Sequence, residues 1–554
     1  MERGEARAVK RSLLVVLLGL TACAHRVPAG ERTVVFIAKQ IRTQDPRRPM
    51  AQALAWKGGK VLAVGSEKEV LAAVGSDVEV ERFPQSTIVP GLVDAHGHVE
   101  SLGRSLSIVS LLDAKSEAEA VKRTQSAPKT AFQGEWLMGR SWDQNDWPGQ
   151  QFPTKAALDA VFPATPVYLS RVDGHAAWVN GEALRRAGIT AATKDPEGGR
   201  ILRDAKGEPT GVLIDNAMDL VATKIPAASD ADLLKHLKLA LETCARLGLT
   251  QVHDAGMDLR TFRLLQQWDM LGVLPVRLYV MADGQGAEAE QFLGLGTFAG
   301  RHLELKAVKL YVDGALGSRG AALHAPYSDE AGSTGLLLLS PEEFEKRASE
   351  FSERGFQVAV HAIGDKANTL ALDVLSKLNP ALRHRVEHAQ VLTAADVGRF
   401  AKSGVIASFQ PTHATSDMPW AEARLGTERV KFAYAWRSVI DAGGKVAFGS
   451  DFPVEDPNPL LGLFAARTRT DAKGAPPGGW MPEQKVTGDE ALAGFTKGAA
   501  YAAFAEERRG VLKEGADADF AVLPIDPVAG DPGALLDARV QVTVVGGVDV
   551  YRAP

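Results

Sequence analysis

Four histidines, one lysine and one aspartate stand in or at the ends of apolar runs, and their types point to metal chemistry. The run ending in DAHGH places His96 and His98 two residues apart. Residues i and i+2 of a strand face the same side, so both imidazoles can reach one point. Imidazole and carboxylate groups suit zinc and similar ions. The remaining candidate ligands follow later in the chain: Lys309, His361, His388 and Asp451.

Lys309 lies in the otherwise apolar run AVKLYVDG and needs a separate explanation. A charged ammonium beside divalent ions would be repelled and costly to bury, and burial lowers the pKa of a lysine. A neutral amine can react with carbon dioxide to form a carbamate, an anion that can bridge two metal ions. With this carbamate, Asp451 and a hydroxide, two divalent ions would carry a net charge of about +1 instead of +4. The alternative is a lysine that extends to the surface or pairs with Asp313.

The middle of the chain, about 91–500, predicts a scaffold that brings such residues together. Eight short apolar segments alternate there with stretches long enough for helices: GLVDAHGH, LTQVHDAG, VRLYVMAD, LKAVKLYVDG, FQVAVHAIGD, HRVEHAQ, VIASFQP and KVAFGSD. Buried parallel strands with helical crossovers are typical of a (β/α)8 TIM-type barrel, an α/β fold. The candidate ligands fall toward the carboxyl ends of these strands, where barrel active sites are built.

Two further units flank the predicted barrel. About 150 residues, rich in Trp and Pro in one stretch, separate its first two strands and predict an insertion at about 104–235 that could cover the barrel mouth. Residues 31–90 and 501–554 contain short β segments and turns, including the hairpin signal KGGK. We therefore expect a small β-sandwich domain formed from both chain ends.

The motifs themselves resemble those of the amidohydrolase superfamily. VPGLVDAHGH, RVDGHAAWVN, KLYVDGALGSRGA, VHAIGD, RVEHA and GSDFPV are similar to its amidohydrolase-3 branch, which includes YtcJ-like proteins and N-substituted formamide deformylases. The resemblance covers nearly the whole chain after the first 30 residues. It implies two divalent ions, with Zn²⁺ as the first candidate. The implied ligands are His96, His98 and Asp451 on one ion, His361 and His388 on the other, and Lys309 as a bridging carbamate.

The predicted site indicates hydrolysis of a carbon–nitrogen bond outside ordinary peptides, in a small amide, formamide or cyclic imide. Metal-activated hydroxide would attack the carbonyl. Asp451, besides binding metal, is the best-placed group to pass a proton to the leaving amine. Two alternatives stay open: a hydrolase with a single ion, such as a deaminase, and a surface binding protein without turnover.

Other polar residues near the predicted barrel mouth are candidates for lesser roles. Four of them could either contact substrate or stabilise a loop, with no preference between the two: His175, Trp178, Asp313 and Arg319. Asp94 and Glu387 are expected to orient neighbouring histidines. Substrate contact and support of the ligands are equally open for the residues that end the second strand, His253 and Asp254. Three histidines receive no role and are taken as surface or rim residues: His324, His384 and His413.

Composition excludes several classes of protein. The chain has 554 residues, with 63 Lys+Arg against 68 Asp+Glu and a net charge of −5. Since neither sign forms a long run, there is no basic face for nucleic acid. Two cysteines, Cys23 and Cys244, exclude a disulfide scaffold. The sequence sets no oligomeric state, although a homodimer would be unsurprising.

The first 30 residues have the order of a secretory leader. A basic stretch precedes the apolar run LLVVLLGL, and LTAC follows. A run of this length cannot cross a hydrocarbon core, which needs about 20 residues. LTAC is similar to a bacterial lipobox, which predicts a signal peptide over residues 1–22 and lipidation of Cys23. We therefore expect an exported protein tethered to a membrane of the cell envelope; a plain leader with an incidental cysteine is the alternative.

Overall fold

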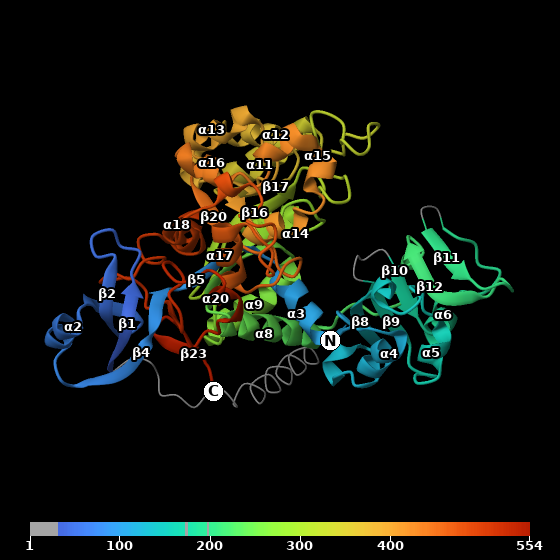
Figure 1. Ribbon diagram of the computed structural model, residues 1–554, viewed down its shortest axis with the longest axis horizontal. Coiled ribbons are helices and arrows are strands. Elements are labelled where there is room, and N and C mark those ends of the chain that lie inside the picture. Colours follow the sequence, from blue (N-terminus) through green and yellow to red (C-terminus); the bar gives the residue numbers. More distant parts are fainter. Residues whose placement is uncertain (1–31, 172–175, 197–198) are drawn as a thin grey trace, which may run out of the picture.

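The computed structural model describes residues 32–171, 176–196 and 199–554, and a (β/α)8 barrel forms its centre (Figure 1). Neighbouring barrel strands pair in parallel. A parallel bridge between Gly97 and Phe452 brings the first and last strands together, so the barrel is nearly closed. The TIM-type fold predicted from the eight apolar segments is confirmed. Its strands are β5 (Leu92–Gly97), β13 (Leu249–Met257), β14 (Arg277–Asp283), β16 (Leu303–Tyr311), β17 (Gln357–Ala362), β18 (Arg385–His388), β19 (Ile406–Phe409) and β20 (Val446–Phe448).

Amphipathic helices pack around these strands. The first long one, α8 (Asp230–Arg246), begins at a capping box formed by Ser229 and Asp232 and buries the apolar side that carries Leu237 and Leu241. The others come between or after the barrel strands: α9 (Leu259–Leu271), α10 (Ala289–Leu295), α11 (Pro341–Glu353), α12 (Asp365–Leu375), α13 (Ala394–Ser403), α14 (Pro411–Asp417), α15 (Ala421–Arg429), α16 (Trp436–Asp441), α17 (Pro459–Thr468), α18 (Gly488–Ala493) and α19 (Ala499–Ala502). A last short helix, α20 (Ala534–Asp537), lies between two strands of the sheet that the chain ends form and contacts α17. A short strand of two residues, β15 (Phe298–Ala299), pairs antiparallel with β16.

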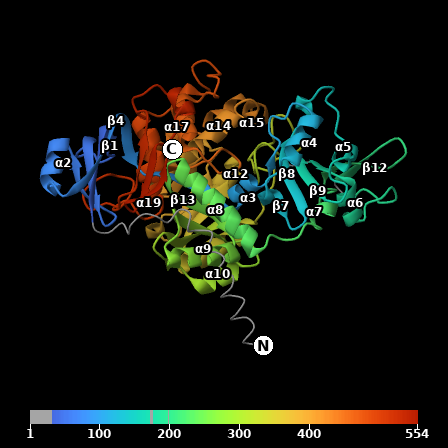
Figure 2. The same cartoon turned by 90° about the horizontal axis from the view of Figure 1, so that it is seen from below.

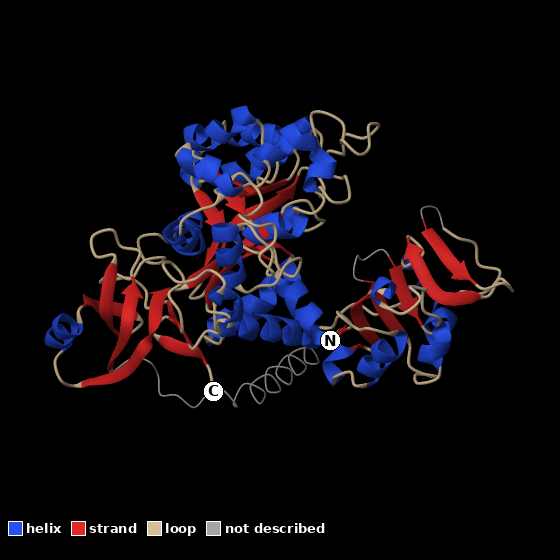
Figure 3. Cartoon of the chain, in the orientation of Figure 1, coloured by secondary structure: helices blue, strands red, loops and turns tan. Residues whose placement is uncertain are grey.

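Strands from both chain ends pair in one seven-stranded sheet on one side of the barrel (Figure 3). They are β1 (Thr33–Arg42), β2 (Met50–Lys57), β3 (Lys60–Gly65), β4 (Val78–Pro90), β21 (Phe520–Leu523), β22 (Val542–Val545) and β23 (Val548–Arg552), with α2 (Glu67–Val74) beside them. The KGGK turn joins β2 and β3, and its two glycines have the positive φ that a tight hairpin needs. The strands pair along one continuous path, yet the rings of Trp56 in β2 and Phe520 in β21, which have β1 and β4 between them on that path, lie 5.1 Å apart. Apolar clusters centre on Phe36 and on Val35.

The insertion lies on the opposite side of the barrel, as both views show (Figures 1 and 2). It contains a second mixed sheet with its own apolar clusters. Its strands are β6 (Val109–Ser110), β7 (Phe132–Gln133), β8 (Trp136–Trp142), β9 (Val167–Arg171), β10 (Ala176–Val179), β11 (Gly199–Arg203) and β12 (Pro209–Asp215). Its helices are α4 (Glu117–Gln125), α5 (Lys155–Asp159), α6 (Gly181–Ala187) and α7 (Asp219–Ala222).

The insertion is shorter than the predicted 104–235 at both ends. Residues 104–107 belong to α3 (Val99–Ser107), and residues 230–235 belong to α8. These two helices pack closely because Gly103 faces the backbone of His236, where a Cβ would lie 1.8 Å from the carbonyl oxygen. Both segments are therefore part of the barrel wall.

None of the helices in the described ranges combines the length and apolarity that a membrane span requires. The predicted leader and Cys23 lie outside the described residues.

Candidate active site

The six predicted ligands meet at the carboxyl ends of the barrel strands. His96 lies in β5 and His98 directly follows it, Lys309 lies in β16, and His361 and His388 lie in β17 and β18. Asp451 follows β20, and its backbone N–H donates a 2.7 Å hydrogen bond to the carbonyl of His96. This bond couples the last strand to the first and holds Asp451 at a positive φ of 61°.

His96, His98 and Asp451 form a compact group of three ligand atoms. Asp451 Oδ1 lies 3.0 Å from His98 Nε2 and 3.6 Å from His96 Nε2. Burial alone would lower the pKa of His98, but the hydrogen bond to Asp451 outweighs it and raises this pKa. Burial alone would raise the pKa of Asp451, but the imidazoles around it hold this pKa well below its usual range. Asp451 is therefore an ionised, acceptor-only group.

Lys309 is buried beside this group. Its Nζ lies 3.1 Å from His96 Nε2, and its side chain is about 1% exposed. The alternative of a lysine extending to the surface is excluded by this burial. The other alternative, a pair with Asp313, finds no support, since the Asp313 carboxylate accepts hydrogen bonds from the backbone N–H groups of Ala322, Ile363 and Gly364. Burial lowers the pKa of Lys309 to about 8, which favours the neutral amine.

His361 and His388 face each other, with ring centroids 4.5 Å apart. His388 Nδ1 lies 2.8 Å from Gln410 Oε1, which can only accept, so Nδ1 carries the proton and Nε2 keeps its lone pair. His361 Nε2 is buried and has no hydrogen-bond partner among the described residues. Burial lowers the pKa of His361 to about 3, so its ring is neutral. Both imidazoles are in the state that metal binding requires.

Buried acids hold the first strand in place. Glu387 Oε2 lies 2.5 Å from His96 Nδ1, which leaves His96 Nε2 as the atom facing the site. Burial would raise the pKa of Glu387, but Arg385 and His96 together lower it well below its usual range. Asp94 accepts hydrogen bonds from the backbone of His96 at 3.0 Å and from the Ser450 hydroxyl at 2.6 Å. Asp94 thus joins the segment before Asp451 to β5.

His253 and Asp254, expected at the end of the second barrel strand, lie within β13 and support neighbouring elements. Asp254 accepts a 2.7 Å hydrogen bond from the N–H of Val99, at the start of α3. His253 is fully buried beside Tyr279, and its Nδ1 lies 2.9 Å from Arg385. Burial places His253 within the barrel interior, away from a substrate.

Trp178 is not available to a substrate. Of the two roles left open for it, substrate contact is therefore excluded. Its side chain is fully buried in the core of the insertion, where it packs edge-on against Trp142 and Trp147. Its Nε1–H donates to the carbonyl of Thr154. The neighbouring candidate His175 lies outside the described residues.

We expect Trp178→Phe to destabilise the insertion by about 1–3 kcal/mol, because the Thr154 carbonyl loses its donor and the smaller ring leaves a gap. Urea unfolding would measure this, and metal content should stay unchanged. Phe152, about 39% exposed near the same cluster, supplies the control Phe152→Leu, which should change stability much less. A loss of bound metal in the Trp178 variant would contradict this structural role.

The remaining two candidates shape the loop after β16. Asp313 is buried, and burial raises its pKa to about 7. The hydrogen bonds that it accepts from three backbone N–H groups lower this pKa but do not outweigh burial. Its Oδ1 lies 3.7 Å from His361 Nε2, so it borders the site. Arg319 forms an ion pair with Asp329 at 3.1 Å and one with Glu330 at 3.2 Å. These contacts fit loop-holding for Arg319.

Three residues near the site received no role from the sequence. His413, in α14, has its Nε2 3.7 Å from Asp451 Oδ2, and its ring lies parallel to that of His388. Gln410 contacts His388, and Arg385 contacts Glu387. For Gln410 and His413, the segment QPTH after the seventh strand could have indicated a role, because polar residues also follow the other strand ends. Arg385 lies outside this segment.

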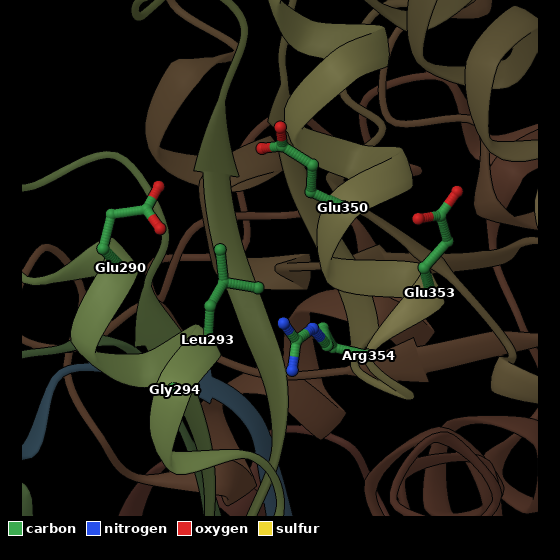
Figure 4. Close-up of a pocket in the computed structure, with 6 residues that line it drawn as sticks. All are labelled: Glu290, Leu293, Gly294, Glu350, Glu353 and Arg354. Atoms are coloured by element: carbon green, nitrogen blue, oxygen red, sulfur yellow. The ribbon is translucent and has the colours of Figure 1, made fainter.

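A surface hollow lies elsewhere, between α10 and α11 (Figure 4). Arg354 on its wall precedes β17, whereas His361 lies near the carboxyl end of that strand. Glu290, Glu350 and Glu353 also line it. This hollow is therefore separate from the histidine cluster.

The residues present fit a metal centre. Two sets of three ligand atoms lie within 4.8 Å of one another: His96, His98 and Asp451, and His388, His413 and Asp451. The imidazoles of His96 and His388, each with Nδ1 held by a neighbour, and the ionised carboxylate of Asp451 are donors of the kind that zinc and related ions bind. The buried, unpartnered Nε2 atoms of His361 and His413 are explained by such an ion.

A (β/α)8 barrel with this donor set at its carboxyl end defines the chain as a hydrolase of the metal-dependent barrel class. The chain belongs to the amidohydrolase family, whose model matches residues 85–551. It is 34% identical to the putative amidohydrolase YtcJ of Bacillus subtilis (strain 168) over 516 residues, which cover 90% of this chain and 96% of that protein.

Two other comparisons agree with this assignment. The chain is 30% identical to the N-substituted formamide deformylase of Arthrobacter pascens over 548 residues, covering 94% of this chain and 98% of that enzyme. It is also similar to the crystal structure of an uncharacterized metal-dependent hydrolase from Pyrococcus horikoshii OT3. That match has a TM-score of 0.76 and 28% identity, and covers 90% of this chain and 99% of the other.

Proposed function

We propose that this protein hydrolyses a carbon–nitrogen bond other than a peptide bond, in an amide, formamide or cyclic imide, at a centre of two divalent metal ions. The observation that carries the proposal is the burial of Lys309 against His96, within a cluster of imidazoles and one ionised carboxylate. A relative that is named as a formamide deformylase and matches nearly the full length supports the substrate class.

The ligand assignment is the one that the resemblance to the amidohydrolase family implies. His96, His98 and Asp451 would hold one ion, and His361 and His388 would contribute to the other. Lys309 would join the two as a carbamate: its neutral amine adds to carbon dioxide, an N–C bond forms, and one proton leaves. The product bears one negative charge where the free lysine would bear a positive one, which removes the repulsion from the ions.

The chain's own residues then account for the proton traffic. Bound metal would lower the pKa of a water molecule from about 15.7 toward about 7 and polarise the substrate carbonyl. Asp451, ionised and facing the cluster, accepts the proton that the attacking water gives up. It returns this proton to the leaving nitrogen as the C–N bond breaks, so that an acid and an amine are released. Glu387 and Gln410 keep two imidazoles in the required tautomers.

The test is the number of metal ions per chain, measured by elemental analysis on wild type and Lys309→Ala. We expect about two ions in wild type and clearly fewer in the variant, with bicarbonate improving uptake by wild type alone. Because burial lowers the pKa of Lys309 to about 8, the neutral amine rises from about a tenth at pH 7 to about nine-tenths at pH 9. Bicarbonate-dependent uptake at fixed dissolved carbon dioxide should therefore be faster at pH 9.

The other outcomes separate the alternatives. About one ion in both proteins would contradict the carbamate bridge and favour a mononuclear hydrolase such as a deaminase. No metal in either protein after zinc supplementation would favour a binding protein. Turnover on a panel of amides, formamides and cyclic imides then separates an enzyme from a binding protein.

We also propose that the protein is exported and held at the cell envelope by lipid on Cys23, on the strength of the leader sequence alone. Cys23→Ser should move it from the membrane fraction to the soluble exported fraction, since the variant lacks the acceptor thiol. The matched control is Cys244→Ser, at a buried thiol in α8. Unchanged fractionation of the Cys23 variant would contradict the anchor.

A further inference from the structure

His413 is positioned as if it were part of the metal centre, although none of the expected ligands comes from the seventh barrel strand. It lies in α14, directly after β19, and its backbone N–H donates a 3.1 Å hydrogen bond to the carbonyl of Gln410. Gln410 thus contacts the His388 ring through its side chain and the His413 backbone through its carbonyl. The two imidazole rings lie 13° from parallel with centroids 6.0 Å apart.

The Nε2 atom of His413 has no hydrogen-bond partner among the described residues, although it is shielded from solvent. Its nearest acid is Asp451, whose Oδ2 lies 3.7 Å away. This distance is too long for a hydrogen bond. Two ligand atoms on one tetrahedral ion, each about 2.0–2.2 Å from it, lie about 3.4 Å apart. The Nε2 atom of His413 is therefore close enough to the cluster to reach an ion there, and no hydrogen bond from the described residues occupies it.

The two oxygens of Asp451 face different imidazoles. Oδ1 lies near His98 and His96, and Oδ2 lies near His413. Oδ2 therefore lies on the side of the cluster where His388 and His413 stand together. His388 completes the second set, since all three ligand atoms of His388, His413 and Asp451 lie within 4.8 Å of one another.

We infer that His413 is a further metal ligand, which binds the second ion together with His388. This inference rests on the proposed dinuclear centre. It adds a ligand from the seventh strand and leaves one oxygen of Asp451 free to carry the proton.

The experiment compares full-length wild type with His413→Ala, His413→Gln and the control His324→Ala, whose imidazole contacts Thr369 instead of the cluster. Each protein is loaded with Zn²⁺ or Co²⁺ in bicarbonate. Ions per chain, chelator competition and the cobalt absorption spectrum are measured, with circular dichroism of the metal-free proteins as a check on folding. The glutamine variant keeps a side chain that fills part of the space if the alanine variant folds poorly.

We expect about two ions in wild type and His324→Ala, and about one in both His413 variants, with the weaker site at least tenfold weaker and a changed cobalt spectrum. Two ions at wild-type affinity with an unchanged spectrum in the His413 variants would overturn only this inference. Loss of both ions in both folded variants would overturn it as well, because His96, His98 and Asp451 should still hold one. A single ion in wild type would overturn the dinuclear centre together with this inference.

Discussion

Replacing Asp451 by asparagine should lower kcat by about 10²–10⁴-fold, the range that a positioned acid–base group contributes. The amide has nearly the same shape, and the hydrogen bond from the backbone N–H of residue 451 to His96 is unaffected. Asparagine, however, cannot accept the proton of the attacking water or return it to the leaving nitrogen. It also presents no negative charge to a metal ion, so metal affinity should fall together with turnover.

Two measurements separate these effects: kcat and KM on the responsive member of the amide panel, and metal content under the same conditions. At metal concentrations that restore full occupancy, kcat should remain low. Asp441→Asn is the control, because this carboxylate is about 65% exposed and pairs with Arg437 far from the cluster. A fully loaded Asp451→Asn enzyme with kcat within tenfold of wild type would contradict the assigned proton transfer.

The eight barrel strands could be predicted because each is buried on both faces and therefore reads as a short continuous apolar run. The ligands could be predicted for the same reason. A lysine in β16, or a histidine at the end of β17, stands out against apolar neighbours. Parallel strands place their carboxyl ends at one rim, so order along the chain becomes proximity in space.

His413 and Arg385 could not be assigned in this way. His413 follows its strand by four residues and lies in a helix of only seven, so neither strand period nor helix period indicates its direction. Arg385 begins β18, where a charged residue usually reaches solvent. Its burial depends on Glu387, Ala95 and Ser408, which come from three different strands. Such a partnership is set by the closed barrel and leaves no local pattern.

Trp178 shows the opposite difficulty. The insertion interrupts the barrel within one crossover, so its polar and aromatic residues read as if they covered the mouth. In the structure it has its own sheet and its own apolar clusters, and Trp178 belongs to one of them. Sequence distance from the strand ends does not distinguish a covering loop from a separate domain with an independent core.

Arg385→Met should destabilise the protein by about 3–5 kcal/mol, the cost of leaving one member of a buried ion pair without its partner. Arg385 and Glu387 are both fully buried, with Arg385 Nε 2.7 Å from Glu387 Oε1. Methionine fills much of the same space. It leaves His96 as the remaining partner of the Glu387 carboxylate, and the Ala95 carbonyl and Ser408 hydroxyl lose the hydrogen bonds that Arg385 donates to them. Urea unfolding measures the loss of free energy.

The same change should weaken metal binding. Without Arg385, burial raises the pKa of Glu387 and favours its protonated form, which no longer fixes the tautomer of His96 as the carboxylate does. The control lies two residues away: Arg383 pairs with Glu506 at 2.6 Å near the surface, and Arg383→Met should cost about 1 kcal/mol or less. In Arg385→Met/Glu387→Leu, where no charge is left unpaired and no acceptor faces His96 Nδ1, part of the stability should return while metal affinity stays low. A loss of less than about 1 kcal/mol in the free energy of unfolding of the single variant would contradict the role of the buried pair in holding β18 against β5. Normal metal binding by the double variant would contradict the role of the Glu387–His96 contact in positioning the ligand.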